Sequence, residues 1–221
     1  MILTVTGGKG GVGKSTVAYN LGAALDGVVV DGDLAMADLP ERRGPDLHDV
    51  LAGRADPLAA VDESGPVTLV PCGRTLAGAR ASDPVRLADV LSRLDRAYRW
   101  VVVDSPAGLQ ADVGLPLSVA DAAVLVTVPE RAALTDALRV RALARELDTG
   151  LCRVVLNRVR DEPRTAALAD QFGAPVVTVP ESDRVATAQR HGRPVGHAAP
   201  GCPAAAAFER LASAAYGCSS L

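Results

Sequence analysis

Two lysines, Lys9 and Lys14, lie five residues apart in a glycine-rich stretch near the N-terminus, and Ser15 and Thr16 follow the second. Every other basic side chain among the 23 lysine and arginine residues of the chain is an arginine. Lysine is a compact point charge on a thin stem, whereas arginine is a broad planar fork. A tight backbone cradle around an anion has room for the first and not for the second. The stretch therefore indicates that phosphate is bound here.

Residues 8–15 match the pattern G-x-x-x-x-G-K-[ST], which is the signature of a phosphate-binding loop. Glycine lets the backbone turn back on itself, so that successive N–H groups point at one anion. We expect Lys14 to reach the β- and γ-phosphates of a nucleotide, Ser15 to bind Mg²⁺ and Thr16 to contact the α-phosphate. The nucleotide-binding residues expected in this loop are Gly8, Gly10, Gly11, Val12, Gly13, Lys14, Ser15 and Thr16.

The elements on either side of the loop have the order that phosphate binding needs. Residues 1–6 form a short β-prone run, and from Ser15 onward apolar residues recur at helical spacing, namely Val17, Ala18, Leu21, Ala24 and Leu25. The helix that begins here directs its N-terminal N–H groups and the positive end of its dipole at the phosphates. A chance glycine-rich turn between a strand and a helix is the alternative, and it would not be expected to show the full consensus.

Carboxylates follow two further apolar runs. Asp31 and Asp33 come after the run at 28–30, and Asp104 ends the run at 100–104. A carboxylate at the carboxyl end of a parallel strand points into the crevice where such sheets bind ligands. Phosphoryl transfer needs Mg²⁺ and a group that orients the attacking water. The alternative for each aspartate is a helix cap or a turn.

Apolar runs alternate with helical segments from one end of the chain to the other. The runs lie at 1–6, 28–31, 68–71, 100–104, 123–128, 153–157 and 175–180. This alternation predicts an α/β fold, doubly wound, with a mostly parallel sheet flanked by helices. The runs are continuously apolar, which indicates strands covered on both faces. We expect one domain over residues 1–217, a surface loop at 40–45 and a short polar tail at 218–221.

Composition excludes several classes of protein. The net charge is −3 and the pI about 5.6, so the chain as a whole is not an electrostatic nucleic-acid binder. No apolar run approaches the ~20 residues that span a bilayer, and we expect a cytoplasmic protein. The cysteines form no C-x-x-C pair, so we expect free thiols and no metal cluster. They are Cys72, Cys152, Cys202 and Cys218.

The stretch K-G-G-V-G-K-S-T at residues 9–16 resembles the deviant phosphate loop of the MinD/ParA family of P-loop ATPases. The resemblance implies that ATP and Mg²⁺ are the cofactors. It also implies that Lys9 reaches across a homodimer interface to the phosphates held by the other subunit. Asp104 with residues 105–108 looks like the Walker B and second-switch sequence, in which the aspartate holds Mg²⁺ through water. Asp33 matches the first-switch aspartate that positions the lytic water.

The resemblance thus implies Lys9, Lys14 and Asp33 as catalytic residues and Ser15, Asp33 and Asp104 as the magnesium site. Residues 47–53 look like the short helix that follows the first switch. Asn157 matches the strand-end asparagine that reads the adenine base, and its amide offers one donor and one acceptor to a purine edge. A turn-forming asparagine is the alternative. Pro180 and Glu181 resemble the backbone segment beside the base.

The resemblance also implies partners. ATP binding would form a homodimer, a further protein would activate hydrolysis, and the output would be to position a structure such as a division site, a motility or sensory array, or DNA. The last helix is Ala-rich, with Glu209 and Arg210 as its charged residues, so direct membrane binding is not expected. Arg184, Arg190 and Arg193 form a basic cluster that leaves non-specific DNA binding open, as in ParA-type partition ATPases; a solvated helix face is the alternative.

A function of a different class is an ATP-dependent small-molecule ligase or carboxylase on the same scaffold. Lys9 distinguishes the two, because a self-contained active site has less need of a lysine from another subunit. Two other branches that share this loop are excluded by cysteine positions. The nitrogenase iron protein needs a cysteine soon after the second switch, and iron–sulfur carriers need a late C-x-x-C; the chain has neither.

Overall fold

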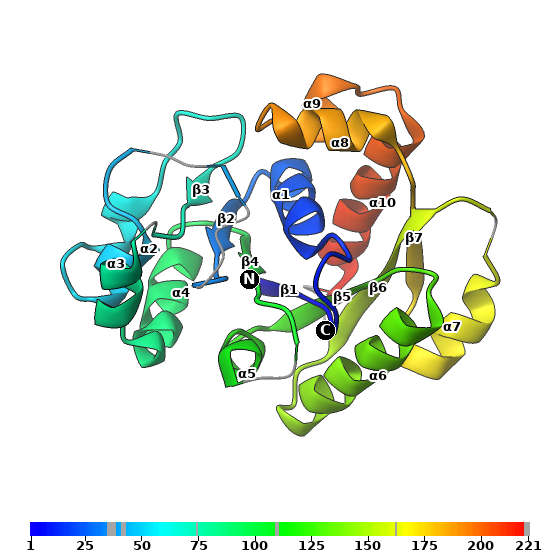
Figure 1. The fold of residues 1–221 in the computed structure, drawn as a ribbon, viewed down its shortest axis with the longest axis horizontal. Coiled ribbons are helices and arrows are strands. Elements are labelled where there is room, and N and C mark those ends of the chain that lie inside the picture. The colour runs from blue at the N-terminus through cyan, green and yellow to red at the C-terminus, as the bar shows by residue number, and fades with distance from the viewer. Residues whose placement is uncertain (35–38, 41–42, 74, 109–110, 162, 219–221) are drawn as a thin grey trace.

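Seven parallel strands form one central sheet in the computed structural model (Figure 1), which describes residues 1–34, 39–40, 43–73, 75–108, 111–161 and 163–218. The strands are β1 (Ile2–Thr6), β2 (Val28–Asp31), β3 (Leu69–Val70), β4 (Val101–Asp104), β5 (Ala122–Thr127), β6 (Leu151–Val159) and β7 (Val176–Pro180). Their order across the sheet is β3-β2-β4-β1-β5-β6-β7, and every pairing between them is parallel. The predicted doubly wound α/β fold is confirmed, and β1 lies at its centre.

Helices cover both faces of this sheet. They are α1 (Lys14–Leu25), α2 (Leu47–Leu51), α3 (Leu76–Ala81), α4 (Leu87–Asp95), α5 (Ala111–Ser118), α6 (Arg131–Glu146), α7 (Thr165–Phe172), α8 (Asp183–Arg190), α9 (Val195–Ala198) and α10 (Pro203–Cys218), with 3₁₀ turns η1 (Pro57–Ala60) and η2 (Pro84–Arg86). Figure 1 shows α1 and α10 on one face and α4, α5, α6 and α7 on the other. Among the described residues, none of these helices is both long and apolar enough to cross a membrane.

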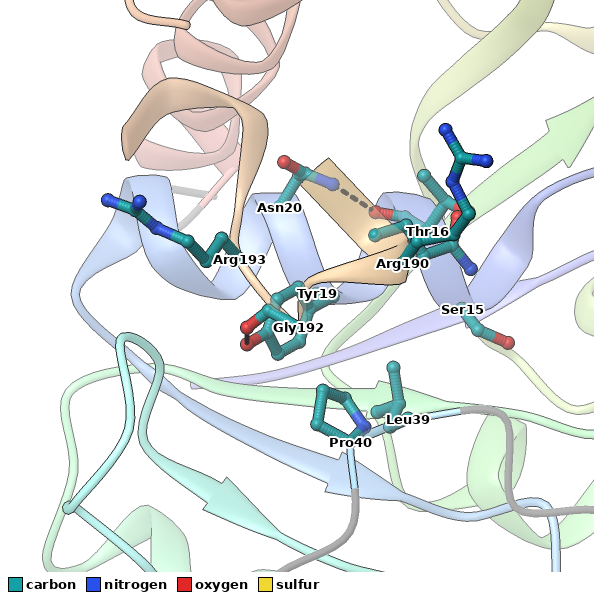
Figure 2. A pocket seen from close by; sticks show the side chains of 10 residues that line it. Ser15, Thr16, Tyr19, Asn20, Leu39, Pro40, Arg190, Gly192 and Arg193 are labelled. Carbon is teal, nitrogen blue, oxygen red and sulfur yellow. Dashed lines mark hydrogen bonds between the residues drawn. The ribbon is translucent and has the colours of Figure 1, made fainter. Parts of the chain in front are cut away.

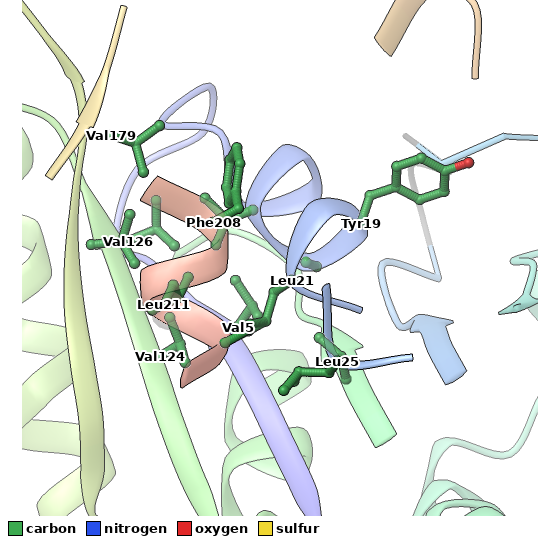
Figure 3. Packing of buried hydrophobic residues seen from close by; sticks show 14 of the residues in the cluster. Val5, Tyr19, Leu21, Leu25, Val124, Val126, Val179, Phe208 and Leu211 are labelled. Atoms are coloured by element: carbon green, nitrogen blue, oxygen red, sulfur yellow. The ribbon is translucent and has the colours of Figure 1, made fainter. Parts of the chain in front are cut away.

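Alternate strand residues supply the two apolar cores, because successive side chains of a strand point to opposite faces. On the α1 face, Leu21 of α1 and Leu211 of α10 pack over Val5 and Val124 (Figure 3). On the other face, Ile2 and its neighbours pack with α2 and α4. Each fully buried aliphatic side chain of this kind stabilises the fold by roughly 1.5–3 kcal/mol. The cores thus hold α1, and with it the start of the phosphate loop helix, against the middle of the sheet.

The amino ends of the strands are closed by polar and aromatic contacts. The Met1 ammonium group pairs with the Asp95 carboxylate, and the Ile2 N–H donates to Asp121 Oδ2 at 2.7 Å. Trp100, which precedes β4, is 1 % exposed and meets the Tyr216 ring of α10 edge-on, with 5.1 Å between ring centroids. These contacts tie the last helix to the strand starts, at the end of the sheet away from the glycine loop.

A disulfide joins Cys152 of β6 to Cys218 at the end of α10, so the expectation of free thiols at these two positions was wrong. The residues are 66 apart in sequence, but packing of α10 on the sheet brings their Cα atoms within 5.9 Å, which is disulfide range. Sequence spacing could not show this proximity. Cys72 and Cys202 are free, as expected, and both are buried.

Several element boundaries differ from the expected ones. The strand expected at 153–157 extends over 151–159, and the one expected at 68–71 is reduced to Leu69–Val70. The final helix includes Cys218, which was expected to begin the polar tail at 218–221; the rest of that expected tail, 219–221, lies outside the described residues. In the expected loop at 40–45, residues 43–45 are exposed, while 41 and 42 lie outside the described residues.

Candidate functional site

The phosphate loop connects the end of β1 to the start of α1. Gly11 and Gly13 adopt φ values of 79° and 96°, in the left-handed region that glycine tolerates without a steric penalty. A Cβ on Gly8 would clash with the Asp136 backbone, whereas a Cβ on Gly10 or Gly11 would meet nothing within 4 Å. The loop is therefore packed against α6 on one side and open on the other. An open glycine backbone at a helix N-terminus fits a bound phosphate chain.

The two loop lysines have different environments. Lys14 is the first residue of α1 and is only 8 % exposed, so its stem is enclosed by its own loop. Lys9 is exposed, and its Nζ lies 3.0 Å from Glu130 Oε2 in an ion pair whose side chains are 45 % and 63 % exposed. Such a surface pair contributes about 0–1 kcal/mol. Lys9 can therefore exchange Glu130 for another anion with little loss.

The predicted carboxylates lie together at the carboxyl ends of β2 and β4. Asp31 and Asp104 are paired in register on these adjacent strands. Both share the face of Val29 and Val102, which pack in the core beneath α1, so the two carboxyl groups project toward that helix. Asp104 is fully buried and Asp31 is 1 % exposed, whereas Asp33 is half-buried.

Glycine at position 32 links the two carboxylate segments. The Gly32 N–H donates to Asp104 O at 2.9 Å, and a Cβ on Gly32 would lie 2.7 Å from that same oxygen. Because residue 32 is a glycine, the chain after β2 can pass directly over the end of β4. The first and second predicted switch segments are therefore hydrogen-bonded to each other.

The carboxylate cluster carries unbalanced negative charge. Burial, together with the neighbouring charges of Asp104 and Asp33, raises the pKa of Asp31 to about 8. Asp31 Oδ1 has no hydrogen-bond partner among the described residues. Burial and the Asp31 charge likewise raise the pKa of the nearby Cys72 thiol to about 12, so that sulfur keeps its proton. A cation would relieve this cluster, and oxygen ligands suit Mg²⁺.

No three His, Cys, Asp or Glu side chains in the described part of the chain are arranged as a metal cage. Mg²⁺ does not require one, because it keeps several waters and is usually bound by one or two carboxylates together with substrate phosphates. Ser15, at the start of α1, and Asp104 and Asp33, at the strand ends, are the side chains that would hold it. The open glycine loop and this donor set fit a nucleotide with its Mg²⁺.

Asn157 lies at the same edge of the sheet, near the end of β6. Its Nδ2 donates to Val12 O at 2.8 Å, and a Cβ on Gly13 would clash with this amide. In this structure the side chain therefore supports the phosphate loop backbone, and its expected contact with adenine stays a prediction. Pro180 ends β7, and the next residue, Glu181, pairs with Arg160. The residues that were expected beside the adenine base thus lie at the strand ends, next to the phosphate loop.

A cavity of about 300 Å³ between α1 and α8 was not predicted from the sequence (Figure 2). Thr16 Oγ1 donates to Gln189 Oε1 at 2.8 Å, and the Tyr19 hydroxyl donates to Gly192 O at 2.7 Å. Asn20 Nδ2 donates to Thr16 O at 2.8 Å, while its Oδ1 accepts from the Val195 N–H at 2.7 Å. The signal in the sequence was two adjacent polar residues, Tyr19 and Asn20, in the part of α1 after Thr16 that is otherwise apolar.

The basic cluster expected near the C-terminus belongs to this region. Arg190 and Arg193 line the cavity, and Figure 2 shows both at its edge, together with Ser15 of the phosphate loop. Arg184 is exposed on α8. Arg190 and Arg193 thus form part of the cavity wall, whereas Arg184 faces solvent.

Comparison with known proteins gives consistent matches over most of the chain. The model of the CobQ/CobB/MinD/ParA nucleotide binding domain matches residues 3–195. An uncharacterized ATP-binding protein of Methanocaldococcus jannaschii is 35 % identical, covering 96 % of this chain and 87 % of the relative. The crystal structure of the cell division ATPase MinD of Pyrococcus furiosus has a TM-score of 0.90 at 33 % identity and covers 98 % of both chains. The septum site-determining protein MinD of Pyrococcus horikoshii, solved with Mg-ADP, has a TM-score of 0.88 at 32 % identity and covers 96 % of this chain and 93 % of its own.

Proposed function

Since this chain belongs to the CobQ/CobB/MinD/ParA nucleotide-binding family, we propose that it is an ATP-driven dimerising switch that hydrolyses ATP slowly. The observation that carries the proposal is the contrast between its two loop lysines. Lys14 is enclosed by its own phosphate loop, whereas Lys9 is exposed and held by a weak surface ion pair. A second lysine that faces outward is available to the phosphates of a second subunit.

The roles of the other residues follow from their positions. The loop N–H groups and Lys14 would bind the phosphate chain, and Ser15 would bind Mg²⁺ directly. Asp104 would hold the ion through water, and Asp33, which is half-buried at the mouth of the site, would orient the attacking water. Bound Mg²⁺ supplies charge neutralisation at the phosphates.

The switching element is the pair of segments that follow Asp31 and Asp104. They are joined by the hydrogen bond from the Gly32 N–H to Asp104 O. Contacts with a γ-phosphate would therefore order both segments together, and hydrolysis would release both. A coupled release of this kind suits a dimer that opens after each turnover.

Residues 1–217 would act as one ATPase domain in the cytoplasm, with a homodimer as the ATP-bound form and a further protein as activator. The positioned structure would be a division site, an array or DNA. For DNA, the exposed arginines of α8 offer a basic surface next to the site, so DNA binding would depend on the nucleotide.

Light scattering of Asp33→Ala, with and without Mg-ATP, tests this function when Lys9→Ala is measured beside it. Loss of Asp33 should trap the ATP state, so ATP should double the mass of Asp33→Ala and leave Lys9→Ala monomeric. Both variants should still bind ATP, because Lys14 is intact.

If both variants bind ATP and both stay monomeric, the switch is excluded. An ATP-dependent ligase or carboxylase with a self-contained site then becomes the better assignment. Equal ATP-driven dimerisation of both variants would exclude the role of Lys9 across the interface.

A further inference from the structure

A histidine and a cysteine are buried behind Asp33, and the proposed mechanism uses neither. His48 of α2 is 2 % exposed, and Cys72, which follows β3, is 4 % exposed. Their side chains meet, with 3.6 Å between His48 Nε2 and Cys72 Sγ. Buried polar side chains are normally hydrogen-bonded, because leaving them without a partner is unfavourable. Their partners therefore indicate what this pair does.

Each of the two side chains contacts a backbone carbonyl of the first-switch segment, residues 32–34. Cys72 Sγ lies 3.4 Å from Asp33 O, and His48 Nε2 lies 3.1 Å from Leu34 O. A carbonyl oxygen can only accept, so the thiol donates to Asp33, and the histidine carries a proton on Nε2 and donates to Leu34. Two consecutive peptide groups of the switch are thus held by buried donors.

Both donors are held by contacts outside the switch. Helix α2 begins with a capping box at Asp46, and the Leu47 N–H donates to Pro71 O at 2.9 Å, which joins the helix to the end of β3. The imidazole ring is covered by the Gly73 backbone, since a Cβ at that position would clash with the ring. His48 therefore has little room to rotate away from the switch.

Two further backbone hydrogen bonds hold the same segment, one to the end of β4 and one within the segment itself. The Gly32 N–H donates to Asp104 O at 2.9 Å, and the Leu34 N–H donates to Gly32 O at 3.1 Å. Asp33 is therefore fixed between a strand end and the two buried donors. The direction of its carboxylate follows from the orientation of these peptide groups.

We propose that His48 and Cys72 are positioning residues that hold the Asp33 and Leu34 carbonyls and thereby aim the Asp33 carboxylate at the phosphate site. The inference rests on the proposed function, because it assigns the pair to the hydrolysis in which Asp33 orients water. Among the described residues, the hydrogen bonds of these two side chains go to the switch segment and to each other, and none reaches the phosphate loop. The pair therefore acts on turnover and not on nucleotide binding.

Removal of either donor should lower kcat and leave the affinity for ATP unchanged. We expect Cys72→Ala and His48→Leu to lower kcat for ATP about tenfold, since a small displacement of a positioned group reduces rates by up to about 100-fold. The Kd for ATP should stay within about twofold of wild type, because the phosphate loop is untouched. His48→Gln keeps an amide N–H near the place of Nε2, and Cys72→Ser keeps a hydroxyl donor. Both conservative variants should regain most of the wild-type kcat.

A second readout needs no ATP. In a Cys202→Ala background, labelling of Cys72 by N-ethylmaleimide reports how firmly the segment covers the thiol. His48→Leu should label at least about fivefold faster than the background protein, and His48→Gln should label as slowly as the background. Cys202 is a buried thiol away from the switch, so Cys202→Ala is the matched control and should keep the wild-type kcat.

The outcomes are distinguishable. A wild-type protein that binds ATP and does not hydrolyse it overturns the proposed function. Normal hydrolysis in wild type together with unchanged kcat in Cys72→Ala and His48→Leu overturns the positioning role alone. Parallel loss of kcat and affinity, or failure of His48→Gln to restore kcat and slow labelling, also overturns it, because a general structural defect would behave in that way.

Discussion

At the carboxyl ends of its strands the sheet carries a glycine loop and three carboxylates, whereas at the amino ends it is closed by a disulfide, an ion pair and an aromatic contact. The carboxyl end keeps buried polar atoms without hydrogen-bond partners among the described residues, including Asp31 Oδ1 and Thr6 Oγ1. At the amino end, Trp100 Nε1 is the corresponding exception. The same strands thus have a reactive end and a closed end.

Ligand binding and stability thus depend on opposite ends of one scaffold. In a parallel sheet all carboxyl ends meet at one edge, so residues that bind a ligand gather there. Like charges and unsatisfied polar atoms at that edge destabilise the fold. The disulfide, the ion pair and the aromatic contact at the amino ends offset this destabilisation without contacting the nucleotide site. Changes at one end should therefore affect stability alone, and changes at the other should affect nucleotide binding.

The largest expected effect is on the closed end. Cys218→Ser opens a loop of 66 residues and should lower the free energy of unfolding by about 4 kcal/mol under non-reducing conditions. Urea unfolding monitored by circular dichroism measures the change, and ATP affinity should be unaltered. Dithiothreitol should destabilise the wild type to the same extent and leave Cys218→Ser unaffected. Equal unfolding midpoints for oxidised and reduced wild type would contradict the contribution of this disulfide.

The next effect is on the reactive end. Lys14→Ala should weaken ATP binding about a hundredfold, or by about 3 kcal/mol, because a buried charge-assisted contact to the phosphates is lost. Isothermal titration calorimetry measures the affinity, and urea unfolding should change little. Lys14→Arg should also bind poorly, because the guanidinium fork does not fit the enclosed position. Affinity within fivefold of wild type for Lys14→Ala would show that nucleotide binding does not depend on this end of the sheet.

Asp31 tests whether the reactive end destabilises the fold. Its folded pKa of about 8 lies above the ordinary 3.8, so the folded state binds the proton more tightly than the unfolded state. The stability that the protonated carboxyl contributes is complete below pH 3.8 and is lost as pH rises toward 8. Without nucleotide and magnesium, Asp31→Asn should therefore be more stable than wild type at pH 8 by about 2 kcal/mol.

Thermal unfolding of Asp31→Asn and wild type between pH 5 and pH 8 measures this difference. The exposed Asp26→Asn substitution is the matched control and should follow the wild-type pH dependence. A wild-type stability that does not fall over this range would show that the carboxylate cluster imposes no strain.

The smallest expected effect distinguishes two roles of Asn157. Loss of its hydrogen bond to Val12 O should weaken binding of both ATP and GTP about fivefold in Asn157→Ala, or by about 1 kcal/mol, because the loop is less well supported. Fluorescent nucleotide titrations measure both affinities. A loss confined to ATP would instead support adenine recognition by this side chain.

The phosphate loop and the sheet could be predicted because their signals are local. Eight consecutive residues specify the loop, and continuous apolar runs specify buried parallel strands. The carboxylates were predicted together because strand ends of one sheet share an edge. For Asp31, a helix cap or a turn stayed open as the alternative, and the register with Asp104 shows that it belongs to the charged cluster.

Contacts between distant segments could not be predicted. The pairing of Cys152 with Cys218, and the hydrogen bonds from Thr16 and Tyr19 to the end of α8, depend on how helices pack on the sheet. The His48–Cys72 contact joins a short helix to a strand end, and no motif marks it. Single-sequence patterns carry no information on such distances.

Trp100 is the single tryptophan of the chain, and it is buried at the closed end of the sheet. Its emission on selective excitation reports the environment of the Tyr216 contact, far along the strands from the glycine loop. Intrinsic fluorescence therefore records unfolding of the scaffold and is insensitive to direct contact with a nucleotide. A spectral change on addition of ATP would mean that nucleotide binding at the carboxyl end of β4 alters the structure around Trp100 at its amino end.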